Sequence, residues 1–245
     1  MNRPAARNAI DLALARALRE ALEDVSADDT VRAVILAGAG PTFSAGGDIK
    51  MMAEAGSAGR EALLLDVTRH FHAAISAIAA MHKPVIAAVR GGAGGGGLAL
   101  MMACDLAIVD EQAKLVFAWS ALGLTPDGGA TFHLTRLVGV KRALEMAFLN
   151  EPIDGRRAVE FGLANRAVPA DDVEKEAVTL AARLGAGPTR AFGRTKELLR
   201  ASMGRVLSET LAIESETIAA VSAEVDAGEG IDAFVEKRAP RFRGM

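Results

Sequence analysis

The stretch that decides the fold is KPVIAAVRGGAGGGGLALMMACD, residues 83–105. A short apolar strand runs directly into six glycines within seven residues, and the chain leaves them as an apolar helix with no polar N-cap side chain. Because glycine loses more conformational entropy on ordering than any other residue, such a density needs a physical reason. The usual reason is that bare N–H groups at a helix N-terminus approach an anion, or a carbonyl oxygen that becomes one.

Three kinds of anion site compete for this glycine run. A phosphate-binding P-loop ends in Gly-Lys-Ser/Thr, and here Gly97 is followed by Leu98, which excludes it. A dinucleotide fingerprint is present in Gly92, Gly94 and Gly97, but the following helix is too short for a crossover unit of roughly thirty residues. An NAD-binding protein is therefore a minor alternative. The third site is an oxyanion hole for a thioester carbonyl, which the rest of the chain favours.

Length and charge limit the remaining classes. A chain of 245 residues can bury a sizeable core, and a net charge of -3 argues against a nucleic-acid surface. The single cysteine, Cys104, permits no disulfide within the chain and is expected to be a buried small hydrophobe. The segment MNRPAARNAI lacks a signal-peptide core, and no apolar run approaches roughly 18 residues. We expect a cytoplasmic protein with neither a nucleic acid nor a membrane as partner.

Strands and helices alternate first, and helices follow, which predicts an α/β body with a helical C-terminal region. We place the body at residues 1–184 and the helical region at 185–245. Strands are expected at residues 31–37, 84–89, 106–109, 114–118 and 163–168. Helices are expected after Asp11 and at about 61–82, 129–137 and 141–149, with a mobile segment around residues 51–60. Everything beyond residue 171 is expected to be helical, with breaks at 185–188 and 228–230.

Six segments carry a resemblance to a known family. They are PTFSAGGDIK (41–50), KPVIAAVRGGAGGGG (83–97), CDLAI (104–108), LGLTPDGGATFHLTRLVG (122–139), AVEFGLANRAVP (158–169) and FVEKRAPRF (234–242). In this order they resemble the crotonase superfamily, the enoyl-CoA hydratase/isomerase family. The resemblance implies an α/β crotonase (ClpP/crotonase-like) spiral of ββα units with a C-terminal helical trimerisation region. It also implies an acyl-CoA thioester substrate, a homotrimer or hexamer, and no separate cofactor, because CoA is part of the substrate.

The resemblance also implies site residues. In the family two backbone N–H groups hold the thioester oxygen, and the matching positions are Gly47 and Gly96. Two late residues are implied to complete the substrate site, Phe234 by closing the acyl pocket and Lys237 by reaching a CoA phosphate from a neighbouring subunit. Further substrate-binding positions are Ala45, Asp48, Ile49, Lys50, His72 and Trp119.

The chain departs from the hydratases of the family at two positions. Hydratases use two glutamates to position and deprotonate water, one three residues after the oxyanion-hole glycine and the other twenty beyond it. Here Ala99 and Trp119 occupy those positions, and neither can do acid–base work. Hydration by the two-glutamate mechanism is therefore not expected.

Asp127 is the carboxylate left for the chemistry, because it is the only one between Gln112 and Leu144. In isomerases of the family an aspartate at the matching place moves a proton between carbons of a bound enoyl-CoA, and one base suffices because it can return the proton it takes. This predicts an enoyl-CoA double-bond isomerase. The structural alternative is that Asp127 caps the helix beginning near Gly129.

A second resemblance is narrower. His72, Gly96, Trp119 and Asp127 have the mutual spacings of the His, Gly, Trp and Asp of 4-chlorobenzoyl-CoA dehalogenases. There the Asp attacks the ring, the Trp hydrogen-bonds it, and the His activates water. Against this, Gly47 stands where those enzymes place a bulky aromatic residue. A dehalogenase-like hydrolase and a non-catalytic crotonase-like protein both stay open, as do a structural role for His72 and a pocket-wall role for Trp119.

Other signals are weak. The four histidines show no metal-ligand spacing, so no metal site is expected. The resemblance also implies a β-hairpin ahead of NRPAARNAI, the segment at which the printed sequence begins.

Overall fold

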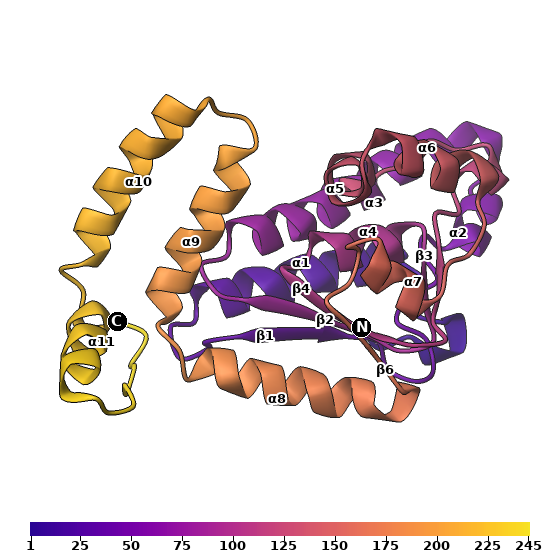
Figure 1. The fold of residues 1–245 in the computed structure, drawn as a ribbon. Coiled ribbons are helices and arrows are strands. Elements are labelled where there is room, and N and C mark those ends of the chain that lie inside the picture. The colour runs from indigo at the N-terminus through magenta and orange to yellow at the C-terminus, as the bar shows by residue number, and fades with distance from the viewer.

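A computed structural model describes residues 1–245 and contains two parallel sheets. The larger sheet has the order β1-β2-β4-β6, and β3 pairs with β5 in the smaller one (Figure 1). The strands are β1 (Val34–Ala37), β2 (Val85–Val89), β3 (Gly92–Gly94), β4 (Leu106–Asp110), β5 (Lys114–Val116) and β6 (Arg166–Val168). Since β1 and β2 are parallel neighbours in the register Val34 to Val85, the loops that follow them emerge at the same edge of the sheet.

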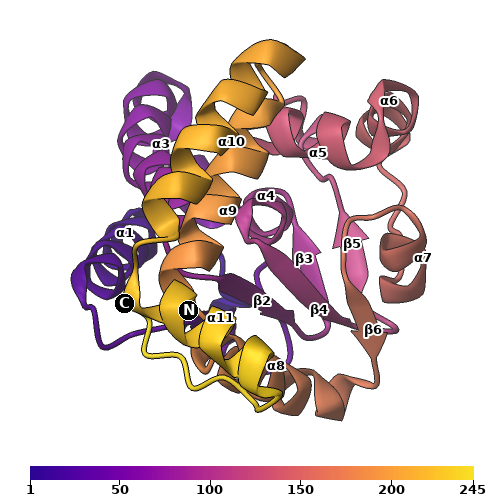
Figure 2. The same cartoon turned by 60° about the vertical axis from the view of Figure 1, so that its left-hand side comes forward.

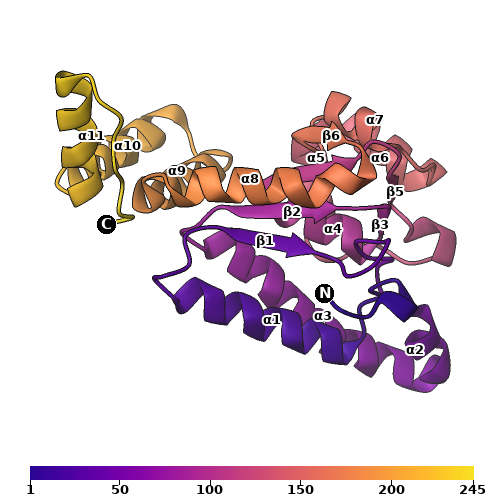
Figure 3. The same cartoon turned by 90° about the horizontal axis from the view of Figure 1, so that it is seen from below.

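Eleven α-helices surround or extend these sheets. They are α1 (Leu12–Ala27), α2 (Ile49–Glu54), α3 (Gly56–Ala80), α4 (Gly96–Ala103), α5 (Ala130–Val138), α6 (Val140–Leu149), α7 (Gly155–Glu160), α8 (Val173–Gly185), α9 (Thr189–Ser202), α10 (Leu207–Val221) and α11 (Val225–Glu236). Figure 3 shows α8 on one face of the strands β1 and β2, with α1 and α3 on the other. No helix is both long enough and apolar enough to cross a bilayer.

The central strand explains the two cores. All five residues of β2 are buried, as expected for a parallel strand covered on both faces. Val85, Ala87 and Val89 point into a main cluster of 36 buried residues, whereas Ile86 and Ala88 join a smaller cluster under α8. The side-chain alternation of a single strand therefore supplies both faces of the sheet.

Most of the expected elements are present, and one expected break is wrong. Residues 51–60, for which no helix was expected, are helical in α2 and the start of α3, and the Asp48 carboxylate caps α2 by accepting the Lys50 and Met51 N–H groups. The break expected at residues 228–230 does not occur, because α11 runs through it. Gly230 faces the C-terminal tail, where a Cβ would lie 3.4 Å from the Phe242 ring, an ordinary contact distance. Neither the strand β3 nor the helix α7 was expected from the sequence.

The last two helices extend away from the α/β body. In Figure 1, α10 and α11 lie at the opposite end of the molecule from α2, and Figure 2 brings them to the front. Helix α10 buries no residue, and its apolar side chains include Leu207 and Ile218, exposed by 73% and 72%. Ion pairs of Asp105 with Lys196 and Arg200 attach α9 to the body, whereas no comparable ion pairs attach α10.

Candidate active site

The glycine-rich motifs pack against each other where the β1 and β2 loops meet. Ser44 bridges Ala93, and a Cβ on Gly46 would lie 2.6 Å from the Gly94 carbonyl oxygen. A Cβ on Gly97 would likewise lie 2.5 Å from the Ser44 backbone oxygen. The glycines therefore allow two backbones to touch, as their density predicted. Because residues 92–94 form a strand of the second sheet, the run does not build the strand–loop–helix unit of a dinucleotide site.

This close packing leaves two backbone amides at one cavity. Gly47 and Gly96 both line a cavity of about 260 Å³. The Gly47 N–H donates to no protein acceptor, and Gly96 is the first residue of α4, whose N–H has no acceptor within the helix. The positive end of the α4 dipole adds to the attraction for negative charge at this point. The two predicted oxyanion-hole donors are thus brought together.

Asp127 lies in the same cavity and is its only ionisable lining residue. Its Oδ1 accepts a 2.9 Å hydrogen bond from the indole Nε1–H of Trp119, which is buried and packs edge-on against Phe117. The carboxylate side chain itself is 32% exposed. Trp119 is therefore both a wall of the cavity and the group that orients one oxygen of Asp127.

The helix-cap alternative for Asp127 is wrong. The N-cap of α5 is Gly129, with no side-chain hydrogen bond, and only the backbone oxygen of Asp127 contacts the helix start by accepting the Ala130 N–H at 3.1 Å. The carboxylate is instead directed into the cavity.

His72 joins this group from α3. Its Nε2 accepts the Gly128 N–H at 3.0 Å and lies 3.7 Å from Asp127 Oδ2. Accepting that N–H requires a free lone pair on Nε2, so the proton of the neutral ring is on Nδ1. His72 thus has a structural role in holding the loop that carries Asp127.

Ala99, which stands at the first of the two hydratase glutamate positions, makes room for this loop. Ala99 is fully buried in α4, and a Cβ on Gly128 would lie 3.0 Å from its methyl group and 2.5 Å from Phe71 Cε1. Gly128 also has a φ of 62°. A small residue at 99 and a glycine at 128 therefore let the Asp127 loop pack closely on α4.

The predicted residues around Gly47 divide into two groups. Ala45 lines the cavity, whereas Ile49 and Lys50 line an adjoining surface cleft of about 760 Å³ that Ala45 and Gly47 also border. Asp48 borders this cleft too, but its carboxylate caps α2 and pairs with Arg3 at 3.1 Å. Burial alone would raise the pKa of Asp48, but hydrogen bonds from the Met51 N–H and from Arg3 outweigh it and hold the pKa below its ordinary value.

The cleft contains two cations that the sequence reasoning missed. Arg3 and Arg7 line it together with Lys50. Arg3 is engaged by Asp11 and Asp48, whereas Arg7 and Lys50 are exposed and make no ion pair. The segment NRPAAR could have indicated these two cations, because its two arginines lie a few residues before Ile10, which forms a strand bridge with Gly47.

Phe234 and Lys237 do not reach the site of their own chain. Both belong to the end of α11, at the far end of the molecule from α2 (Figures 1 and 3), and the Phe234 side chain is 85% exposed. The basic tail beyond them folds back on α11, because Arg238 pairs with Glu229 at 2.6 Å and the Arg243 N–H donates to Asp226, while the side chains of Arg241 and Arg243 stay exposed.

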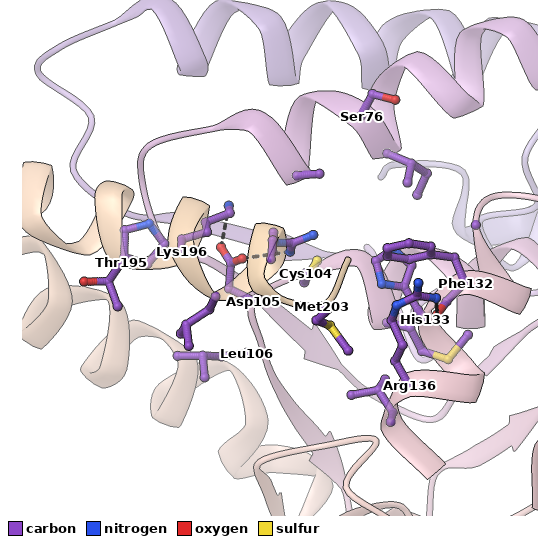
Figure 4. Close-up of a pocket in the computed structure, with 18 of the residues that line it drawn as sticks. Ser76, Cys104, Asp105, Leu106, Phe132, His133, Arg136, Thr195, Lys196 and Met203 are labelled. Atoms are coloured by element: carbon purple, nitrogen blue, oxygen red, sulfur yellow. Dashed lines mark hydrogen bonds and ion pairs between the residues drawn. The ribbon is translucent and has the colours of Figure 1, made fainter. Parts of the chain in front are cut away.

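A larger cavity of about 730 Å³ lies elsewhere, between α9, α5 and the end of α3 (Figure 4). Three of its charged groups satisfy one another, since Asp105 accepts from Lys196 at 2.7 Å and from Arg200 at 2.9 Å. His133 borders it, and burial, together with the charges of Arg200 and Arg136, lowers the pKa of His133 to about 4. Size alone does not make it a reaction site, because its only carboxylate, that of Asp105, is paired with Lys196 and Arg200.

Comparisons with known proteins agree with the fold. A family described as enoyl-CoA hydratase/isomerase matches residues 1–245. A 1,2-epoxyphenylacetyl-CoA isomerase of Escherichia coli (strain K12) is 33% identical over 100% of this chain and 93% of the relative. A 4-chlorobenzoyl coenzyme A dehalogenase-2 of Arthrobacter sp is 32% identical over 89% and 79%. The crystal structure of an enoyl-CoA hydratase from Polaromonas sp. JS666 has a TM-score of 0.94 at 33% identity, covering 98% of this chain and 93% of that one.

Fold and site together define an α/β protein with free amides and a carboxylate at one small cavity. The chain belongs to the enoyl-CoA hydratase/isomerase family, the crotonase family, whose members bind acyl-CoA thioesters. It has the crotonase fold and is an acyl-CoA enzyme of that family.

Proposed function

We propose that this protein is an enoyl-CoA isomerase that shifts a double bond along the acyl chain with Asp127 as its acid–base group. The observation that carries the proposal is the content of the 260 Å³ cavity, which combines the amides of Gly47 and Gly96 with a single ionisable side chain. Hydration by the two-glutamate mechanism uses two acid–base groups, whereas a proton shift between carbons needs one.

The steps follow from this arrangement. The thioester oxygen accepts the N–H groups of Gly47 and Gly96, which stabilise the negative charge that develops there as a proton leaves carbon. Asp127 takes a proton from the α-carbon of a 3-enoyl chain, or from the γ-carbon of a 2-enoyl chain, and gives a dienolate. The same carboxyl group returns the proton to the other carbon, so the double bond moves and Asp127 is regenerated.

The Trp119 hydrogen bond assigns the two oxygens of Asp127 to different tasks. Oδ1 is held by the indole N–H, which leaves Oδ2 to carry the proton. A fixed carboxylate meets both carbons from one side of the acyl chain, which favours transfer within the bound complex.

A second candidate is dehalogenase-like hydrolysis, favoured by the same Trp119–Asp127 bond and by His72 at 3.7 Å. In that reaction Asp127 attacks a ring carbon of an aryl-CoA thioester, chloride leaves, and water hydrolyses the aryl ester. The position of His72 counts against it, because Nε2 already accepts the Gly128 N–H and is not free to take a proton from water.

The cleft that adjoins the cavity is the site that we propose for the CoA moiety. Arg7 and Lys50 are its two unpaired cations, and we propose that they meet the CoA phosphates. Charge reversal in Lys50→Glu should raise KM more than it lowers kcat, since it removes binding that ground and transition states share.

The Asp127→Asn variant tests the isomerase proposal. Asparagine keeps the acceptor for the Trp119 N–H but cannot move a proton, so exchange of deuterium from solvent into the acyl chain should fall by about 10²–10⁴-fold. Affinity for acetoacetyl-CoA, measured by titration calorimetry, should stay close to that of the wild type. Exchange that survives in the variant would remove Asp127 from the proposed role.

Two measurements on the wild type separate the alternatives. Chloride release from 4-chlorobenzoyl-CoA through an aspartyl ester would establish the dehalogenase reaction instead. Thioester binding with neither exchange nor chloride release would indicate a non-catalytic member, and binding of NADH alone would indicate a dinucleotide site. Hydration of crotonyl-CoA should be negligible, because Ala99 and Trp119 stand at both glutamate positions.

A further inference from the structure

A strained turn lies directly ahead of Trp119. The Ala118 backbone has a φ of 73°, and the Trp119 N–H donates to the Phe117 carbonyl, two residues back, at 3.1 Å. A three-residue turn with a positive φ at its centre is rare and strained. Alanine has no preference for this conformation, so groups outside the turn must hold it.

The Asn150 side chain provides a hold on this turn. Its Oδ1 accepts the Ala118 N–H at 2.6 Å, from a residue 32 positions away in the sequence. Asn150 ends α6 with φ 55° and ψ 29°, a left-handed conformation that asparagine tolerates well. The two segments are held beside each other because Leu115 and Ile153 exchange backbone hydrogen bonds of 2.9 and 3.0 Å. The Asn150 amide is therefore fixed relative to the turn.

The same turn also fixes the position of the Trp119 indole. The turn and the indole pack on Gly95, the residue before the Gly96 donor, where an added Cβ would lie 3.7 Å from Ala118 Cβ and 4.0 Å from Trp119 Cε2. From this position the Trp119 Nε1–H reaches Asp127 Oδ1 at 2.9 Å. A turn that relaxed to a negative φ would rotate the chain entering Trp119 and carry the indole N–H away from the carboxylate.

We propose that Asn150 is a positioning residue of the candidate site. Its Oδ1 stabilises the strained turn at Ala118, the turn aims the Trp119 indole, and the indole orients Asp127. The kinetic consequence rests on the isomerase function proposed above, whereas the structural consequence does not.

Trp119 is the only tryptophan of the chain, so intrinsic fluorescence reports on it directly. The test variant is Asn150→Gly, which removes the acceptor but keeps a residue that favours a positive φ at the end of α6. The conservative variant is Asn150→Asp, which keeps both the acceptor and the tolerance for this conformation. We expect the glycine variant to show a red-shifted emission maximum and at least twofold stronger acrylamide quenching. The aspartate variant should restore most of the wild-type spectrum.

Kinetics and a rescue variant complete the test. In Asn150→Gly, kcat should fall about tenfold with KM changed less than twofold, because the thioester donors are untouched. Adding Ala118→Gly should recover part of the emission and of kcat, because glycine adopts the positive φ without support. A merely structural role would lower the urea midpoint of Asn150→Gly and leave the native emission unchanged, and that result would overturn the proposal. Equal impairment of the aspartate and glycine variants would overturn it too.

Failure of the isomerase function would give a different pattern. If Asp127→Asn kept exchange while Asn150→Gly shifted the emission of Trp119, the positioning chain would stand and the function assigned to it would fall. If Asp127→Asn abolished exchange and Asn150→Gly left emission unchanged, the function would stand and the role of Asn150 would fall.

Discussion

At the scale of single residues, the proposed chemistry depends on the Gly96 backbone amide as well as on the Asp127 side chain. Gly96 is the first residue of α4, and a Cβ at this position would meet Ile10 Cδ1 at 3.4 Å and Phe71 Cε1 at 3.6 Å, ordinary contact distances. A side chain can therefore be added there without removing the N–H. The preceding residue, Gly95, has φ 47° and ψ -121°, outside the α region that a following proline disfavours.

These facts give a matched pair of variants. Gly96→Pro removes the N–H at the one helical position where proline is well tolerated, and it should lower kcat about 10²–10³-fold. Gly96→Ala keeps the N–H and should lose far less activity. Turnover of an enoyl-CoA substrate, with circular dichroism as a check on folding, measures both. Equal losses in the two variants would mean that steric filling, and not the donor, is responsible.

The buried position of His133 makes the stability of the protein depend on pH. Burial, followed by the charges of Arg200 and Arg136, lowers the pKa of His133 to about 4 in the folded protein, from an ordinary 6.5. The unfolded chain therefore binds a proton at a higher pH than the folded chain. This contribution to stability is complete above pH 6.5 and is lost as the pH falls toward about 4.

The His133→Gln variant isolates this effect from the other titrating groups. We expect the free energy of unfolding of the wild type to fall more steeply between pH 6.5 and 4 than that of the variant. Urea denaturation at several pH values measures both slopes. Parallel slopes would show that His133 takes up its proton equally well in the folded state.

At the scale of elements, the sequence predicted the strands and long helices and missed what depends on tertiary contact. The apolar runs before and after the glycines identified β2 and β4, because parallel strands covered on both faces need continuous hydrophobic residues. The strand β3 was missed, since Gly92–Gly94 has no strand propensity and pairs with β5 only through the packing of the two sheets. The glycines of α11 were misinterpreted as a break, because a glycine inside a helix costs only about 0.5–1 kcal/mol relative to alanine and does not by itself end the helix.

The candidate site likewise contains residues that the sequence predicted and contacts that it did not. Gly47, Gly96 and Asp127 follow from the motifs of the resemblance, and the structure places them in one cavity. The Asn150 contact joins residues 32 positions apart, and nothing in the sequence near either residue indicates it. Side-chain contacts across the fold are therefore the part that the sequence alone left undetermined.

The attachment of α9 to the body gives a prediction at this scale. Asp105 accepts from Lys196, from Arg200 and from the Val85 N–H, and the Lys196 side chain is only 10% exposed. Asp105→Asn keeps an acceptor but leaves both cations without a counter-charge. We expect the free energy of unfolding to fall by about 2–3 kcal/mol, less than the roughly 3–5 kcal/mol for a fully buried pair, because Arg200 is partly exposed.

A matched control for this variant lies on the surface. Asp171 pairs with Arg90 at 2.8 Å, but its side chain is 91% exposed. Asp171→Asn should therefore change the free energy of unfolding by less than about 1 kcal/mol. Chemical denaturation of both variants provides the comparison, and similar losses would contradict a structural role for the Asp105 cluster.

At the scale of the whole molecule, the exposed apolar face of α10 and α11 calls for a partner surface. Helix α10 buries no residue, and Leu207, Leu211, Ile218, Phe234 and Val235 are all more than half exposed. Apolar surface of this extent is rarely left open to water. We propose that the region 185–245 packs against neighbouring copies, in which Phe234 and Lys237 would reach the substrate site that their own chain does not offer them.

This arrangement predicts a trimer, or a hexamer of two stacked trimers. Light scattering at micromolar concentration should give about three or six times the 25.4 kDa mass of the chain. Ile218→Glu places a charge on the exposed face of α10, where a single chain buries nothing, so it should lower the mass without unfolding the α/β body. Glu209→Gln, which removes a charge from the first turn of the same helix, serves as the control and should leave the mass unchanged. A wild-type protein that is monomeric under these conditions would contradict the packing of α10 and α11 on a second chain, and a helix with no buried residue would then have to be stable through α9 alone.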